Sequence, residues 1–342
     1  MVSQEGGNVR VYGIDGNFDD AQSGVKQIFA SRVREQSVQD NCENSSTDLP
    51  FKLSSANSIN IGRLVPQIMY YFTAYRDLLR AGKIVLGDIV DFSVPTGNFG
   101  DILAGYLAKR LGLPVGKLIC ASNANNVLTD FLRTGIYDRR RRLHKTISPS
   151  MDILVSSNLE RMLYFLCEDS TQVRKWMEEL QNDGKYELPA DLLARLQEHF
   201  WAGYCTDEAA QETIARVWKE TGYLCDPHTA AGWKAAVDYT RETAGDREYT
   251  GTDSVQKSAD SAQDGRKRVM VVLSTASPYK FPRAVLTALG AAPIGDDFAL
   301  LAQLEALTGV PVPKNLSALA GKTELHPDVI AKEQMREAAL MP

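Results

Sequence analysis

Residues 94–101, Val-Pro-Thr-Gly-Asn-Phe-Gly-Asp, combine residue types that suit phosphate binding. This stretch, which we call the glycine loop, follows a short apolar run at residues 89–94 and precedes a helical pattern at residues 102–111. Two glycines let the backbone turn tightly and present successive N–H groups to one point. The helix start adds unpaired N–H groups and a partial positive charge, which favour a phosphate. The same residues also suit an ordinary strand-to-helix connection, and the pattern alone leaves both interpretations open.

A second candidate site is the stretch Ser274–Phe281, which follows an apolar run at residues 269–273. Open α/β sheets bind their ligands beyond the carboxyl ends of the strands, where this stretch is expected to lie. The Thr275 hydroxyl can bond to a ring nitrogen or a phosphate, and Lys280 offers a cation to an anionic substrate. The alternative is a strand end with turn residues and a solvated lysine.

A third candidate is the stretch Ser55–Arg63, in which small polar residues precede a helical pattern. Such residues suit a helix N-cap, which is the structural interpretation. The functional interpretation is that Asn57, Ser58 and Asn60 hydrogen-bond to a carboxylate or phosphate of a substrate at that helix end. Arg63 then lies one turn into the helix.

The remaining polar motifs are interpreted as structural. Residues 226–229, Asp-Pro-His-Thr, resemble a metal-binding or catalytic fragment, but a single histidine makes no metal site, and a turn with a helix N-cap fits better. The four histidines show no HxxxH or HxH spacing and the five cysteines no CxxC spacing, so no metal site is expected. The arginine run at residues 139–142 is typical of a solvated loop. No GxSxG motif, Walker loop or GxGxxG after a strand is present.

Alternating strands and helices are expected to position these loops. Predicted strands cover residues 8–14, 89–94, 117–121 and 269–273, and predicted helices cover residues 20–34, 58–79, 102–111, 125–134, 158–182, 189–200, 207–220, 229–242 and 281–289. Strand, helix and strand around the glycine loop make a βαβ unit, which implies a parallel sheet covered on both faces. Residues 37–53 are polar and predicted to be a loop, and residues 243–267 lack an apolar run and are predicted to be a flexible surface insertion.

The composition is that of an ordinary globular protein. The chain has 342 residues, 44% hydrophobic and 24% charged, which is enough for a large core or two domains. A net charge of −5 leaves no basic surplus for a nucleic-acid partner. No apolar run reaches the length of a membrane span. The scattered, odd cysteine count argues against a disulfide framework and fits a reducing compartment, so a cytoplasmic protein is expected.

Seven strings, taken in order, resemble threonine synthase, a pyridoxal-phosphate (PLP) enzyme of the fold-type-II, tryptophan-synthase β-like group. They are residues 16–26, 55–60, 94–105, 111–114, 148–153, 226–230 and 273–281. One such string is a weak signal, but seven in one order are specific, and the resemblance is to the microbial and fungal branch. It implies an α/β fold with an open parallel sheet flanked by helices.

The resemblance also implies site residues and an activity. The family binds the phosphate of PLP on the glycine loop, which carries over to Gly97, Asn98, Phe99 and Gly100. A threonine hydroxyl faces the pyridine nitrogen, which carries over to Thr275. The family converts O-phospho-L-homoserine and water to L-threonine and phosphate, with the cofactor as electron sink.

One family motif has no counterpart in this sequence. The Schiff-base lysine of the family lies in a string of the form P-T-x-x-F-K-D, which does not occur here. None of the other lysines considered lies in a matching string: Lys26, Lys83, Lys109, Lys117 and Lys280. We therefore expect the chain to correspond to about the C-terminal two-thirds of the enzyme, without a catalytic lysine. Residues 1–55 are then a remnant of the smaller N-terminal domain, and residues 56–342 form the larger, cofactor-binding domain.

Two alternatives to an active threonine synthase remain open. One is a catalytically inactive homologue that binds a phosphorylated ligand or a partner. The other is a different fold-type-II lyase, such as a threonine dehydratase or a cysteine synthase, although those lack the long strings at residues 55–60 and 226–230. No nucleic-acid or membrane partner is expected, and the oligomeric state stays open.

Overall fold

The computed structural model of the chain describes residues 2–16, 20–29, 54, 60–244 and 268–340. The chain divides into two compact units. The larger unit comprises residues 56–312, and the smaller one combines residues 1–55 with residues 313–342. The glycine loop belongs to the larger unit.

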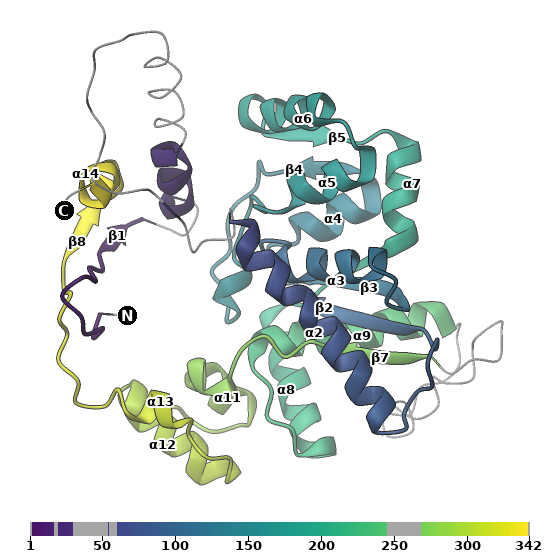
Figure 1. The fold of residues 1–342 in the computed structure, drawn as a ribbon. Coiled ribbons are helices and arrows are strands. Elements are labelled where there is room, and N and C mark those ends of the chain that lie inside the picture. The colour runs from purple at the N-terminus through teal and green to yellow at the C-terminus, as the bar shows by residue number, and fades with distance from the viewer. Residues whose placement is uncertain (1, 17–19, 30–53, 55–59, 245–267, 341–342) are drawn as a thin grey trace, which may run out of the picture. The chain divides into compact units, whose positions relative to one another are not determined.

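Four parallel strands form the central sheet of the larger unit (Figure 1). They are β2 (Val90–Pro95), β3 (Val115–Ser122), β6 (Phe200–Tyr204) and β7 (Val269–Val272), in the order β6-β3-β2-β7. All six residues of β2 are buried, which is typical of a strand covered on both faces. The predicted α/β fold with an open parallel sheet is confirmed.

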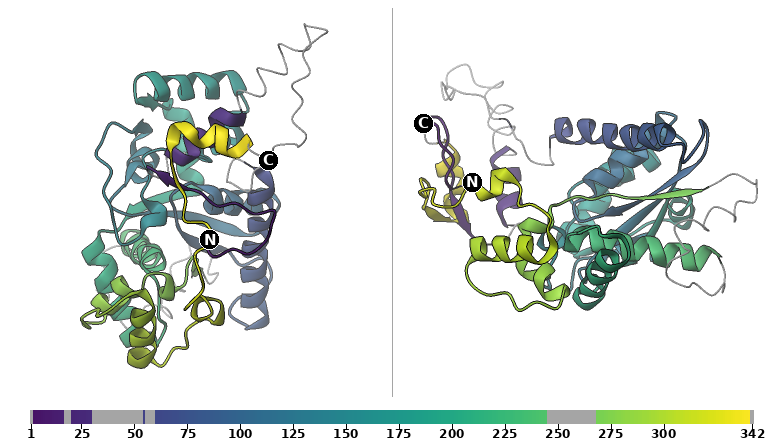
Figure 2. Two further views of the ribbon diagram at one scale, coloured as in Figure 1. Left: turned by 90° about the vertical axis from the view of Figure 1, so that its left-hand side faces the viewer. Right: turned by 90° about the horizontal axis from the view of Figure 1, so that it is seen from below.

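Helices cover both faces of this sheet (Figure 2). On one face α9 (Pro227–Ala244) contacts all four strands, and α8 (Asp207–Thr221) packs against α9. On the other face lie α3 (Gly100–Arg110), α4 (Val127–Thr134) and α7 (Ala190–His199). The long helix α2 (Ile61–Arg80) packs on α3 through its buried Leu64, Tyr71 and Tyr75. The other elements of this unit are β4 (Ile136–Asp138), η1 (Pro149–Met151), α5 (Leu159–Cys167), α6 (Ser170–Asn182), β5 (Lys185–Glu187), η2 (Pro278–Lys280), α11 (Pro282–Ala288) and α12 (Asp297–Thr308).

Several segments of the larger unit differ from the prediction, and the short strands β4 and β5 were not predicted. The helix predicted over residues 158–182 is two helices, because Glu168 adopts a left-handed conformation with φ of 56° and Asp169 then caps α6. The helix predicted over residues 189–200 ends at His199, and the next five residues form β6, which the sequence analysis missed. Of the insertion predicted at residues 243–267, residues 243–244 belong to α9, and residues 245–267 lie outside the described residues.

The smaller unit joins the two ends of the chain. β1 (Gly13–Asp15) pairs in parallel with β8 (Val329–Ala331), so the predicted strand at residues 8–14 is shorter and shifted. Helical residues 20–29 lie against the C-terminal segment. A Cβ atom added to Gly24 would lie only 2.5 Å from the Met335 sulfur. Residues 313–342 were expected in the larger domain, whereas the structure groups them with residues 1–55. The remaining elements here are α13 (Lys314–Ser317), η3 (Lys332–Gln334) and α14 (Met335–Leu340).

Candidate functional site

The glycine loop connects the carboxyl end of β2 to the start of α3, as the sequence predicts. Its turn is made at Phe99, which adopts the left-handed conformation with φ of 58° and serves as the N-cap of α3. The Phe99 side chain is buried and packs against Phe200 at a ring-centroid distance of 5.6 Å. The strain of this conformation is therefore offset by packing against β6.

The two glycines of the loop have ordinary φ angles, so their role is different from the tight turning that the sequence suggests. A Cβ atom on Gly97 would lie 3.0 Å from the Ser150 carbonyl oxygen and 3.1 Å from the Met151 Cα. Gly97 is therefore required because another backbone segment passes directly beside it. A Cβ on Gly100 would lie 3.5 Å from the Asn158 Nδ2, which is an ordinary contact.

A row of backbone donors begins the helix after this loop. Within the described part of the chain, the N–H groups of residues 98–102 donate to no other residue. Donors of this kind at a helix N-terminus form an anion site when they point to one place. Asp101 lies in the same first turn, where burial raises the pKa of its carboxyl to about 6 and a hydrogen bond from Tyr71 lowers it. The Tyr71 hydroxyl also donates to the Asp101 carbonyl oxygen at 2.8 Å.

The carbonyl groups of the loop are held by the residues before α5. The Ser156 hydroxyl donates to the Gly97 carbonyl oxygen at 2.9 Å, and the Asn158 side chain donates to the Asn98 carbonyl oxygen at 2.8 Å. The Ser157 hydroxyl donates to the Asn98 Oδ1 at 3.2 Å. This support was not predicted, although the Ser-Ser-Asn run at residues 156–158 before a helix is a signal for polar capping residues.

The segment beside Gly97 is fixed by a half-buried polar network at the end of β3. The Asp152 carboxylate accepts hydrogen bonds from the Asn123 and Asn125 amides at 2.7 and 3.0 Å. It also accepts from the Thr146 hydroxyl at 2.7 Å and from the Thr146 N–H at 3.0 Å. Four donors on one carboxylate lock residues 146–152 to the sheet edge where the glycine loop lies.

The predicted residues after β7 lie on the strand next to the glycine loop. β7 pairs with β2, and the Leu273 N–H donates to the Ser93 carbonyl oxygen at 2.9 Å, so Thr275 follows at the same carboxyl edge of the sheet. Thr275 and Lys280 are both exposed. The Ser274 hydroxyl accepts a hydrogen bond from the Tyr223 hydroxyl at 2.8 Å. The structure therefore brings the first and second sequence candidates to one edge.

The third candidate lies at the start of α2. Asn60 is the N-cap, and its Oδ1 accepts from the Gly62 N–H at 2.9 Å, as the structural interpretation predicts. Arg63 is exposed and lies one turn before Gln67, whose Oε1 is 3.9 Å from the Cβ position of Gly100. The start of α2 is thus close to the start of α3. Asn57 and Ser58 lie outside the described residues.

The interpretation of residues 226–229 as a turn with a helix N-cap is confirmed, since the Asp226 carboxylate accepts from the N–H groups of His228 and Thr229 before α9. Among the described residues no group of three or more His, Cys, Asp or Glu side chains is placed to hold a metal ion. No described helix has the length and apolar character that crossing a membrane requires.

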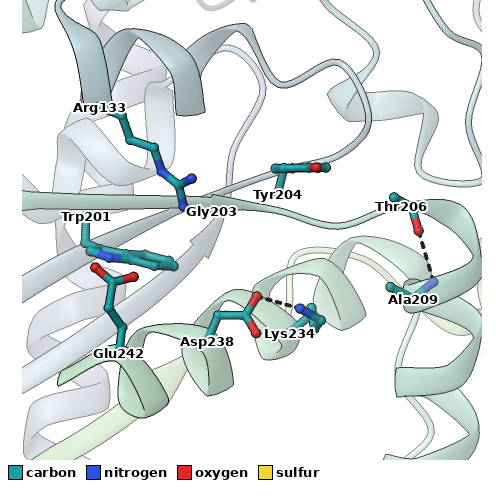
Figure 3. Close-up of a pocket in the computed structure, with 9 residues that line it drawn as sticks. All are labelled: Arg133, Trp201, Gly203, Tyr204, Thr206, Ala209, Lys234, Asp238 and Glu242. Atoms are coloured by element: carbon teal, nitrogen blue, oxygen red, sulfur yellow. Dashed lines mark hydrogen bonds and ion pairs between the residues drawn. The ribbon is translucent and has the colours of Figure 1, made fainter. Parts of the chain in front are cut away.

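A cavity of about 390 Å³ lies elsewhere, beside β6 (Figure 3). Its lining comes from α4, β6, α8 and α9: Arg133, Trp201, Gly203, Tyr204, Thr206, Ala209, Lys234, Asp238 and Glu242. Lys234 pairs with Asp238 at 2.5 Å, and Arg133 donates to the Ala202 carbonyl oxygen at 2.8 Å. None of the predicted site residues lines this cavity.

Known proteins similar in sequence to this chain include threonine synthases and proteins named after them. A family model described as "Threonine synthase, C-terminal" matches residues 251–330. Threonine synthase from Pseudomonas aeruginosa is 39% identical over 295 residues, which are 86% of this chain and 54% of that protein. Human threonine synthase-like 1 is 39% identical over 244 residues, which are 71% of this chain and 32% of that protein. The chain thus spans between about a third and about half of the length of these relatives.

Solved structures of threonine synthases are also similar to this chain. The PLP-bound threonine synthase from Brucella melitensis is 35% identical with a TM-score of 0.68, covering 96% of this chain and 60% of that one. Threonine synthase from yeast is 29% identical with a TM-score of 0.70, covering 97% of this chain and 59% of that one. The chain is therefore similar to threonine synthases in sequence and in structure over nearly its whole length, and it has the α/β fold of the fold-type-II group of pyridoxal-phosphate enzymes.

Proposed function

We propose that this chain forms the phosphate-binding part of a threonine synthase site, which acts on O-phospho-L-homoserine and water to give L-threonine and phosphate. The observation that carries the proposal is the row of N–H groups at residues 98–102, free of partners in the described part of the chain. Close packing beside Gly97 holds this row in place. A phosphate group fits such donors, because each N–H meets an anionic oxygen that accepts it.

Each residue then has a role toward the cofactor, PLP. Gly97, Asn98, Phe99 and Gly100 form the backbone cradle of its phosphate. Thr275, on the neighbouring strand end, offers a hydroxyl to its pyridine nitrogen. When bound, PLP supplies an electron sink for bonds broken at the substrate carbons. Because a hydroxyl carries no negative charge, Thr275 does not favour a proton on that nitrogen.

Residues at the start of α2 and after β7 are proposed to bind the substrate. Asn57, Ser58 and Asn60 offer hydrogen bonds, and Arg63 and Lys280 offer positive charge to a substrate that carries a carboxylate and a phosphate. No catalytic lysine is assigned within the 342 residues, because the family string around that lysine does not occur in them.

Binding of PLP and of inorganic phosphate, measured by calorimetry, tests the phosphate cradle. Gly97→Val and Gly100→Val should weaken binding of both probes at least tenfold. At Gly97 the side chain meets the backbone of residues 150–151 and displaces the loop, and at Gly100 the added methyl groups crowd the row of N–H groups. Gly7→Val is the matched control, since no atom lies within 4 Å of its Cβ position and its φ is ordinary. Unchanged affinity in both loop variants would rule out the cradle.

A phosphate-release assay separates a synthase from an inactive homologue. Residues 1–342 with PLP and O-phospho-L-homoserine should release no phosphate, and borohydride reduction should attach PLP to no single lysine. Turnover together with a stoichiometric adduct at one lysine would show that a lysine outside the family string serves catalysis.

A further inference from the structure

A buried histidine lies directly behind the backbone that packs on Gly97. His228 is 2% exposed and its partner Asp226 is 0% exposed. The His228 Nδ1 lies 2.8 Å from the Asp226 Oδ1, and its ring lies 4.8 Å from the Phe281 ring. A ring buried this deeply acts on a ligand only through other residues.

The hydrogen bonds fix the tautomer and the orientation of this ring. The Ser150 N–H donates to the His228 Nε2 at 3.2 Å, so Nε2 carries the lone pair. Nδ1 therefore carries the proton and donates it to the Asp226 carboxylate. That carboxylate is itself held by the His228 N–H at 2.8 Å and by the Thr229 hydroxyl. The ring thus presents an acceptor to Ser150 from a fixed position.

One end of the bond between Ser150 and His228 is tied to β2, and the other end is tied to the glycine loop that follows β2. On one side, the Ser93 hydroxyl donates to the Gly232 carbonyl oxygen at 2.6 Å, and the Cβ position of Gly232 lies 3.1 Å from the Pro95 ring. This fixes the first turns of α9. On the other side, Ser150 and the following Met151 are the backbone atoms nearest to the Cβ position of Gly97.

We propose that His228 is a positioning residue, whose Nε2 holds residues 150–151 against Gly97 and thereby keeps the glycine loop in its phosphate-binding form. The phosphate part of this inference rests on the proposed function, whereas the positioning part does not. Loss of one neutral hydrogen bond should shift the loop equilibrium about 2- to 10-fold, and phosphate affinity should fall by a similar factor.

Two substitutions separate the two ring nitrogens. His228→Asn keeps a donor near the Nδ1 position, facing Asp226, but provides no acceptor at the Nε2 position. His228→Gln provides an acceptor near the Nε2 position. Phe281→Leu is the control, since it removes the ring contact and keeps both hydrogen bonds. We expect His228→Asn to speed amide hydrogen exchange in residues 148–153 and to weaken binding of PLP and inorganic phosphate about 2- to 10-fold. In His228→Gln the exchange rate and the affinity for the two probes should be close to those of the unmodified chain. Phe281→Leu should change neither the exchange rate nor the affinity.

The outcomes distinguish this inference from the proposed function. The positioning role would be overturned if His228→Asn and His228→Gln had equal effects. It would also be overturned if neither variant changed amide hydrogen exchange in residues 148–153. If the unmodified chain binds neither probe but His228→Asn alone speeds exchange at residues 148–153, positioning stands and the proposed function fails.

A measurement on the unmodified chain does not depend on how the variants fold. With four histidines in the sequence, the ring nitrogens can be assigned by ¹⁵N NMR. We expect His228 to be neutral with its proton on Nδ1. A proton on Nε2 would contradict the geometry on which the proposal rests.

Discussion

Gly97 and Gly100 differ in their surroundings, and this difference predicts opposite effects of the same substitution. In Gly97→Ala the new Cβ meets the Ser150 carbonyl oxygen at 3.0 Å and the Met151 Cα at 3.1 Å, so these atoms must move by a few tenths of an ångström. Overpacking against backbone costs about 1–3 kcal/mol. Alanine also restricts the unfolded chain, which stabilises the folded state by about 0.4–1 kcal/mol. The free energy of unfolding should therefore fall by about 0.5–2 kcal/mol.

In Gly100→Ala the new Cβ meets the Asn158 Nδ2 at 3.5 Å, which requires no movement. Only the unfolded-state effect remains, so this variant should gain about 0.4–1 kcal/mol. The two variants should then differ by about 1–3 kcal/mol. For a unit of this size, that separates their melting temperatures by roughly 2–4 °C for each kcal/mol.

Calorimetric scans of the two variants beside the unmodified chain measure this difference. Hydrogen exchange of residues 148–153 shows whether the destabilisation is local to the segment that touches Gly97. If Gly97→Ala melts at or above the temperature of Gly100→Ala, the close backbone approach does not limit which residue fits at position 97.

Three further predictions concern the elements around the loop. Asp101 has a folded-state pKa of about 6, above its ordinary value of 3.8, so its contribution to stability is lost as the pH rises from about 4 to 6. The free energy of unfolding of Asp101→Asn should therefore match that of the unmodified chain at pH 4 and exceed it at pH 7 by at most about 3 kcal/mol. Urea unfolding at the two pH values measures this, and the same difference at both pH values would contradict it. Glu168→Gly should stabilise the chain by about 0.5–1 kcal/mol, because Glu168 is exposed and left-handed, and a thermal melt with no gain would show that its backbone is unstrained. Gly105→Ala should lower stability by at least about 1–3 kcal/mol, because its Cβ would lie 2.6 Å from the Tyr71 ring and 2.8 Å from Leu118, and an unchanged melting temperature would refute this.

The local pattern was sufficient to predict where the glycine loop lies. An apolar run, two glycines and a helical period are adjacent in sequence, and β2, the loop and α3 follow in that order. The partners of the loop could not be predicted in this way. Ser150, Met151 and Asn158 lie more than fifty residues further along the chain, and no periodicity relates them to Gly97.

The missed elements have similar physical causes. β6 has only five residues, Phe-Trp-Ala-Gly-Tyr, and follows a helix without a turn signal, so its pairing with β3 was not evident from its own composition. The break between α5 and α6 occurs at Glu168, a residue that rarely adopts a left-handed conformation. The positive φ of the glycine loop likewise occurs at Phe99 rather than at either glycine, because packing against Phe200 outweighs the local preference.

The hydrogen bonds that α4 makes to β6 affect what a strand of another molecule would meet at this edge of the sheet. β6 stands at one end of the described strand order, where an uncovered strand offers a template for another chain. Carbonyl groups alternate in direction along a strand, and the Cys205 N–H donates to the Ser122 carbonyl oxygen of β3, so the Ala202 carbonyl is directed away from β3. Arg133 donates to this Ala202 oxygen at 2.8 Å. An incoming strand from a neighbouring molecule would have to displace the guanidinium group before it could pair there. One side chain of a short helix thus disfavours the edge-to-edge stacking from which fibrils grow.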